Sequence, residues 1–505
     1  MAHHFANGIP PRLLMWQRVR EYAVPPSMIE TATTRRAVGD WAGACAAARI
    51  DVDLDLRAVR NRHGTDLVTH LRADLRRLAP DLLRWHMPRI APDGRLRPGL
   101  TIALARYRSS GATPLQLVVR TPPAWADAGQ RMSLALWEGP GNGAPWHHPH
   151  PHPHPDRRFR LDLHRHLWDS GRSSELARRC GAGGAPSMTP PPDRSPAPGR
   201  PVLPDRPDLP QPDRPSVHGS PWAVASWAAE AELLLRAEGR PRGAFTVRLG
   251  VRSRAVLELV APDDSHAPTF RPLREALPPQ EVAALLVLPE AAARVLPDLE
   301  LLRAGLVASE RLHPLVAAAL AASCSTPVAR PAPEPGDPHR VECRGEVHRI
   351  ALRDGSLTAI DHDPAQLRRE ELLVALGGPA LPCLRAIDAV HRNPEALPAV
   401  RERLGHGDVA GALAVVEGLL GPGAVLREGP LRDELESAAA RRIDHGLFRS
   451  GLVTVHPGVG AAGAGNASGA GHPEAGHRPR IDRRTPPAMR RKRSSRARPR
   501  TGLTR

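Results

Sequence analysis

Histidines interleaved with prolines form the most conspicuous group of potential metal ligands in this chain. The five residues are His147, His148, His150, His152 and His154. Imidazole nitrogens bind zinc, copper or nickel, but a structural site holds its ligands in a closed shell. Because alternating His-Pro sequence is extended and repetitive, the pattern predicts a surface loop with weak, adaptable metal binding. No cofactor is predicted.

Other possible ligands are scattered through the C-terminal half. His339, Cys343 and His348 could bind a metal together, but no fourth ligand is evident from the sequence. The run Asp361-His362-Asp363 could form a metal or acid–base cluster. Asp363, however, is already explained as the N-cap of a helix that begins at the following proline.

Motifs of common enzymes are missing or lack their context. The chain has no GxSxG and no HExxH sequence. Residues 458–463 fit GxGxxG, but a dinucleotide site needs a helix after the glycines, and a Gly-rich segment follows instead. His164 and His166, close to Trp168, are expected to be packed or hydrogen-bonded core residues.

Lysine is almost absent: Lys492 stands against sixty-nine arginines. A P-loop, an ordinary kinase and a Schiff-base enzyme each need a lysine amine in the folded core. Arginine cannot supply a nucleophilic amine, because its guanidinium group stays protonated. These classes are therefore disfavoured. The excess of Arg, Ala, Gly and Pro is typical of a high-GC genome.

Positive charge is concentrated at the C-terminal end. The formal net charge is +17, and residues 471–505 hold twelve basic and two acidic side chains. Such a segment can bind polyanions through counterion release, without base stacking because it lacks aromatic residues. A reading frame without selection would produce a similar composition. The candidate polyanion-binding residues are Arg490, Arg491, Lys492, Arg493, Arg496, Arg498 and Arg500.

The five cysteines form no CxxC pair, and their odd number and long spacing are typical of reduced thiols in a cytoplasmic protein. No secretory signal pattern is present, and no apolar run approaches the length of a membrane span. The sequence thus predicts a cytoplasmic protein without a membrane segment.

Changes in composition and periodicity divide the chain into seven parts and predict an α+β fold, mainly helical with short β-hairpins. The parts are a disordered or mis-called N-terminus (1–23), an α+β body (24–179), a Pro-rich linker (180–221), an α+β middle segment (222–325), a second Pro-rich linker (326–338), a hairpin with a helical bundle (339–452) and a disordered Gly/Arg-rich tail (453–505).

Hydrophobic periodicity predicts the elements within these parts. Expected helices cover 27–49, a segment from 66 with leucines at three- and four-residue steps, 222–237, most of 281–322, 366–376, 382–392, 394–404, 408–420 and 431–448. Expected strands cover 101–107, 115–120, 132–137, 159–163, 245–249, 255–260, 347–352 and 357–360. The last two strands flank Asp354-Gly355, a typical type I′ hairpin turn.

Residues 39–46 and 407–414 are identical at six of eight positions. Chance similarity in an Ala/Gly-rich chain is one explanation. A related pair of helical hairpins at the two ends of the chain is the other.

Three phrases, at 82–88, 121–125 and 369–373, resemble sequences of an uncharacterised protein family of high-GC actinobacteria. The resemblance covers the two outer bodies and skips the linkers and tail. It implies that the outer bodies are ordered. It carries over no activity and no functional residue.

These observations favour a non-catalytic cytoplasmic interaction or scaffold protein with an unidentified protein partner. One alternative is a protein that binds nucleic acid or another polyanion without sequence preference through its tail. Another is a metal-dependent enzyme of unknown class. The sequence predicts no catalytic residue.

Overall fold

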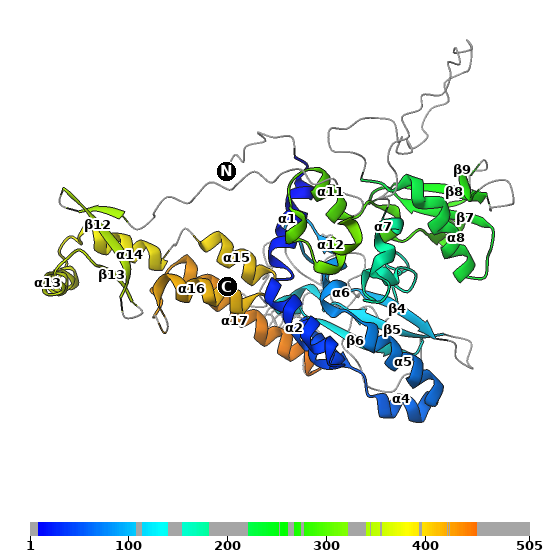
Figure 1. Cartoon of the computed structure of the whole chain (residues 1–505), viewed down its shortest axis with the longest axis horizontal. Helices are drawn as coiled ribbons and strands as arrows, with labels where there is room; N and C mark the ends of the chain where they lie inside the picture. The colour runs from blue at the N-terminus through cyan, green and yellow to red at the C-terminus, as the bar shows by residue number, and fades with distance from the viewer. Residues whose placement is uncertain are drawn as a thin grey trace, which may run out of the picture.

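The computed structural model shows an α+β protein that is mainly helical, as the sequence predicts (Figure 1). The described residues are 9–107, 114–139, 154–180, 221–251, 253–260, 267–273, 277–321, 340–343, 345–353, 356–392, 396–421, 423 and 425–451. Within these ranges, no helix has the length and apolar content needed to cross a lipid bilayer.

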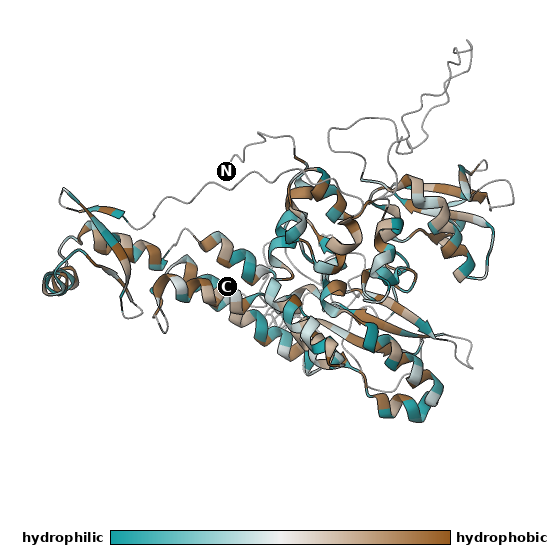
Figure 2. Ribbon diagram, viewed as in Figure 1, coloured by the Kyte–Doolittle hydropathy of each residue, from teal (hydrophilic) through white to brown (hydrophobic). Residues whose placement is uncertain are grey.

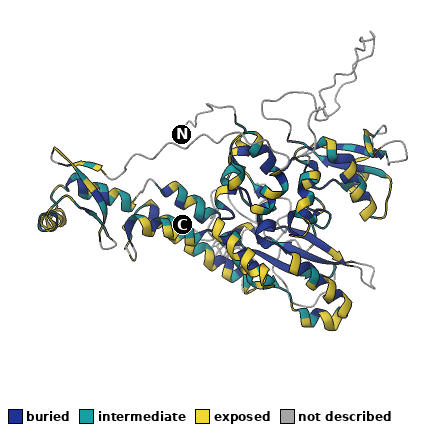
Figure 3. Cartoon of the chain, viewed as in Figure 1, coloured by how far each residue is buried: buried dark blue, intermediate teal, exposed yellow. Residues whose placement is uncertain are grey.

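The main sheet has four strands in the order β1-β6-β5-β4. They are β1 (Ile50–Asp53), β4 (Thr101–Tyr107), β5 (Leu115–Arg120) and β6 (Met132–Trp137). β4, β5 and β6 are antiparallel neighbours, whereas β1 lies parallel to β6. The predicted hairpin and third strand are confirmed, and β1 was not predicted. β4 and β5 are buried on both faces, which explains their nearly continuous apolar sequence (Figure 3).

Helices cover the main sheet and bury leucines at helical spacing. They are α2 (Pro26–Ala37), α3 (Trp41–Ala47), α4 (Leu56–His63), α5 (Thr65–Arg77) and α6 (Pro80–His86). Leu67, Leu71 and Leu75 of α5 all enter the main core, while the opposite face of the helix is polar (Figure 2). Pro80 begins α6, since a proline fits the first turn of a helix.

The prediction that residues 1–23 are disordered is wrong for α1 (Pro11–Tyr22). This helix buries Leu13, Met15 and Val19, together with the side chain of Arg20. Its apolar period is weak because a charged residue takes one of the core positions. Arg20 can do so because it pairs with a buried carboxylate from a distant part of the chain.

The strand predicted at 159–163 is also wrong. Its alternating sequence mimics a strand, but the backbone turns: the amide of Phe159 donates to the carbonyl of Asp156, and that of His164 to Leu161. Only an isolated bridge joins Arg160 to Ala103 of β4.

The middle segment contains a smaller sheet of order β10-β7-β8-β9. Its elements are α8 (Trp227–Ala237), β7 (Gly243–Arg248), β8 (Arg254–Val260), β9 (Thr269–Pro272), α9 (Pro279–Ala284), β10 (Leu286–Val287) and α10 (Glu290–Ala293). The predicted hairpin is confirmed by the antiparallel pairing of β7 with β8. These elements form a hydrophobic cluster of their own around Trp227 and Phe245.

The middle segment is not one unit, contrary to the predicted boundary at 325. Its last two helices, α11 (Pro297–Arg303) and α12 (Pro314–Leu320), pack into the main core through Leu299 and Val316. A buried hydrogen bond of 3.0 Å between His313 Nε2 and a carboxylate oxygen of Asp81 supports this attachment. The predicted helical region at 281–322 is therefore divided between two cores.

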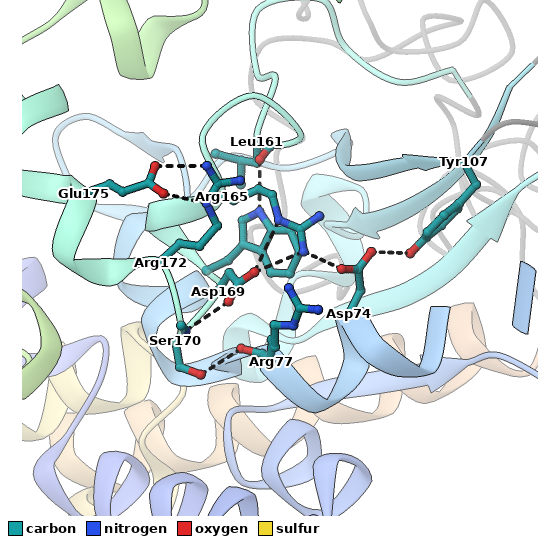
Figure 4. A network of polar contacts seen from close by, with 11 residues as sticks. Asp74, Arg77, Tyr107, Leu161, Arg165, Asp169, Ser170, Arg172 and Glu175 are labelled. Carbon is teal, nitrogen blue, oxygen red and sulfur yellow. Dashed lines mark hydrogen bonds and ion pairs between the residues drawn. The ribbon is translucent and has the colours of Figure 1, made fainter. Parts of the chain in front are cut away.

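A buried polar network fixes the loop after the main sheet (Figure 4). The guanidinium group of Arg165 bridges the carboxylates of Asp74 and Asp169 and lies over the ring of Trp168. The hydroxyl of Tyr107 donates to Asp74 over 2.9 Å. Each charged group has an opposite charge beside it, so the network is a structural support.

The C-terminal part contains two small cores rather than the single predicted bundle. The first, formed by β11 (Arg340–Cys343), β12 (Glu346–Arg353), β13 (Ser356–Ala359), α13 (Pro364–Ala375) and α14 (Pro382–Arg392), is called the terminal module below. The second contains α15 (Leu397–Gly405), α16 (Val409–Leu420) and α17 (Pro430–Arg449). The predicted hairpin and helices are confirmed. They do not form one bundle, because α13 and α14 pack with the hairpin in one core and α15, α16 and α17 pack together in another.

The two similar segments at 39–43 and 407–411 have the same local structure. In each, a glycine with positive φ ends one helix and an aspartate caps the next, accepting from the amide three residues later. An arginine five residues before each aspartate pairs with its carboxylate. These arginines are Arg35 and Arg403. The similarity therefore corresponds to a repeated helix–Gly-Asp–helix hairpin.

Candidate metal centre

The terminal module brings together three potential metal ligands. The sulfur atoms of Cys343 and Cys383 and a ring nitrogen of His362 all lie within 4.8 Å of one another. Both cysteines are fully buried and His362 is partly buried. Two thiolates and an imidazole are a set of ligands that zinc prefers.

Each ligand is positioned by a different local structure. Cys343 is the last residue of β11 and faces Glu346 across the tight β11–β12 hairpin. His362 precedes Asp363, whose carboxylate accepts from the amide of Ala365 and caps α13 as predicted. Cys383 lies in the first turn of α14, and this helix packs against β11. The packing of α14 on the hairpin therefore completes the cluster.

The chemistry of the thiols suits a metal more than catalysis by a free thiolate. Burial, followed by a hydrogen bond with Cys343, raises the pKa of Cys383 to about 11. A free thiol with such a pKa is protonated and unreactive at neutral pH. A zinc ion would displace the proton, because metal ligation stabilises the thiolate.

His348 lies next to His362, outside the group of three close ligand atoms. Its ring stacks on that of His362 with centroids 4.1 Å apart and planes 15° from parallel. Its Nδ1 is buried and makes no hydrogen bond, and its Nε2 is 3.8 Å from a carboxylate oxygen of Glu346. In the register of β11 and β12, His348 lies on the same sheet face as Cys343.

The apolar core of the terminal module is small. Among the described residues of the module, Ile350 and Ile387 are buried away from the cysteines. The cluster around the cysteines has five buried members: Cys343, Ala359, Leu367, Leu381 and Cys383. Two of these five are the cysteines of the cluster. Modules of this size with so little buried apolar surface usually need a metal or disulfides to fold. The cluster lies where such a support is needed.

The structure relates this cluster to the ligands predicted from sequence. Cys343 and His362 lie together and His348 lies next to them, whereas the sequence suggested two separate groups, one with Cys343 and His348 and one with His362. Cys383 was missed as a ligand, because it is forty residues from Cys343 and belongs to no CxxC pattern. His339 lies outside the described residues.

Most of the other candidate sites predicted from the sequence are not tested by the structure, and His164 and His166 are buried core residues. His147, His148, His150, His152, the 458–463 glycines and the whole predicted polyanion-binding tail lie outside the described residues. His154 is exposed and contacts the ring of Trp137 edge-on. His164 and His166 are buried as expected, and His164 Nε2 lies 3.1 Å from a carboxylate oxygen of Glu230.

Comparison of the chain with protein-family models, with curated proteins and with solved structures finds no match. The interpretation of the cluster therefore depends on its geometry and chemistry alone.

Proposed function

We propose that this chain is a non-catalytic interaction protein whose terminal module is folded around a zinc ion. The observation that carries the proposal is the convergence of Cys343, His362 and Cys383. His348, whose ring stacks on that of His362, is the proposed fourth ligand. Four protein ligands close the coordination shell, and zinc in a closed shell stabilises structure instead of activating water.

An apolar surface on the same module supports the interaction role. Leu372, Leu373, Val374 and Leu376 are all exposed at the C-terminal end of α13, and Leu376 is 87% exposed. Val347 of β12 is exposed as well. Apolar side chains gathered in this way mark contact sites for other proteins, since each would gain about 25 cal/mol per Å² on leaving water. The proposed partner is thus a protein that presents a complementary apolar surface.

The experiment compares partners captured from native cells by the full wild-type chain and by two variants. Leu372→Glu/Leu376→Glu places charges on the α13 surface, and Cys343→Ser/Cys383→Ser removes two ligands. We expect the serine variant to lose its zinc, as measured by elemental analysis, and both variants to lose the same partner.

The matched control is Leu413→Glu, because Leu413 is an exposed leucine of α16 outside the terminal module. This variant should keep both the zinc and the partner. Recovery of the same proteins by all four chains would contradict the interaction role. Zinc bound equally by the wild-type chain and the serine variant would contradict the metal site.

A further inference from the structure

Cys343 and Cys383 form a close pair of thiols in the terminal module. Their sulfur atoms lie within 4.8 Å of each other, and the two side chains are hydrogen-bonded. Forty positions separate the residues in the sequence, and the packing of α14 on β11 brings them together. Two elements that already pack together thus hold both sulfur atoms in one core, which is the arrangement that disulfide formation requires.

Two further cysteines lie in a different core. Cys45 and Cys180 are both buried in the main body. Burial raises the pKa of Cys45 to about 12, which keeps that thiol protonated and unreactive. The Cys180 thiol contacts the carbonyl of Ala177 at 3.6 Å. These two thiols are therefore internal references for a reaction of the pair in the terminal module.

The proposed zinc ion would make the pair reactive toward peroxide. Zinc binds cysteines as thiolates, and the thiolate is the form that peroxides oxidise. Hydrogen peroxide is small and uncharged. The cluster around the cysteines has only five buried members, so local opening of the module gives peroxide access to the sulfur atoms.

We infer that hydrogen peroxide oxidises Cys343 and Cys383 to a disulfide and thereby releases the zinc ion. This inference rests on the zinc site of the proposed function. One thiolate sulfur attacks the peroxide, so that an S–O bond forms and the O–O bond breaks. The second thiolate attacks the resulting sulfenic sulfur, so that the S–S bond forms and the S–O bond breaks. Each departing hydroxide takes a proton from solvent. The two sulfur atoms lose two electrons in total, and one peroxide becomes two water molecules.

The disulfide differs from the zinc ion in the elements that it joins. A disulfide contains no thiolate to bind the metal, so His362 loses its metal bond while β11 and α14 stay connected. His362 directly precedes Asp363, which caps α13. The helix α13 carries the exposed Leu372 and Leu376. Oxidation therefore frees the segment with the interaction surface and makes its attachment dependent on the redox state.

The test treats the full wild-type chain, reduced and loaded with zinc, with hydrogen peroxide while a chromophoric chelator reports free zinc. We expect one zinc ion released for each disulfide formed, and a peptide map that links Cys343 to Cys383. Cys45 and Cys180 should still react with iodoacetamide after unfolding. Dithiothreitol with added zinc should restore the bound metal, which oxidation to sulfinic acid would not allow.

Cys45→Ser is the matched control, because it removes a buried thiol outside the terminal module. It should release zinc as the wild-type chain does. The inference would be overturned by zinc that stays bound in peroxide, by zinc release without the Cys343–Cys383 link, or by a link to another cysteine. Each of these results leaves the zinc site itself standing. A purified chain without zinc would instead contradict the proposed zinc site and, with it, the inference.

Discussion

Removal of zinc from the full chain is expected to unfold residues 340–392 while the main sheet stays folded. Among the described residues of the terminal module, the hydrophobic cluster around the proposed ligands has five buried members, two of which are the cysteines, and Ile350 and Ile387 are buried as well. A structural zinc ion contributes apparent binding free energies of about 10–16 kcal/mol in small domains. A contribution of that size is as large as the whole stability of a typical domain, so the fold of the module should depend on the metal.

Hydrogen exchange measured by mass spectrometry checks this prediction. After chelation, amides of β12 and α14 should exchange at rates typical of unfolded chain, whereas those of β4 and β5 should stay protected. The protection in the terminal module should return when zinc is added back. Unchanged exchange in a chain shown to be zinc-free would contradict the structural role.

The same site predicts a dependence on pH. Zinc binds the thiolate, and burial raises the pKa of Cys383 to about 11. The proton of Cys383 must therefore be displaced at any pH below that value. The apparent affinity should fall about tenfold for each unit that the pH is lowered, for this proton alone. Lower pH thus favours the metal-free, unfolded module.

Asp298→Ala is expected to cost about 3–5 kcal/mol of unfolding free energy, because it leaves a buried guanidinium group unpaired. Both oxygens of Asp298 accept from Arg20, at 2.8 and 2.6 Å, and one also accepts from the indole N–H of Trp85. The Arg20 guanidinium group also contacts the rings of Trp16 and Trp85, at 4.9 and 4.5 Å from their centroids. The variant would lose a large fraction of the stability of a typical domain.

Denaturant unfolding of matched variants distinguishes the cost of an unpaired buried charge from the cost of lost packing around Arg20 and Asp298. Arg20→Met/Asp298→Leu replaces both charges with apolar groups and should regain most of the loss, since it leaves no buried charge. Glu436→Ala breaks a pair on the exposed face of α17 and should leave the unfolding midpoint unchanged. A double variant as unstable as Asp298→Ala would contradict the explanation by unpaired charge.

The sequence correctly predicted those elements that are set by residues close together in the chain, such as turns and helix caps. Asp354-Gly355 between alternating apolar runs predicts the β12–β13 hairpin, and Asp363 before a proline predicts the start of α13. The antiparallel pairing of β12 with β13 and the Asp363 cap are both confirmed, because such interactions act within a few residues, while Asp354 and Gly355 themselves lie outside the described residues. By contrast, the strand predicted from the alternation at 159–163 is wrong, because the backbone there forms turns and the polar residues Arg160 and Asp162 form an ion pair with each other.

Long-range pairings explain what the sequence could not show. Arg20 occupies a core position in α1 only because Asp298, far along the chain, neutralises it. Cys383 joins Cys343 only through the packing of α14 on β11. Neither pairing leaves a period or a spacing in the sequence. The helix α1 and the complete ligand set therefore emerged only from the three-dimensional structure.

X-ray absorption at the zinc edge of the full wild-type chain tests the central claim most directly. The proposed ligands predict two sulfur atoms at about 2.3 Å and two imidazole nitrogens at about 2.0 Å from the metal. The two nitrogens correspond to His362 and His348. A zinc shell without sulfur, or a purified chain that contains no zinc, would contradict the account.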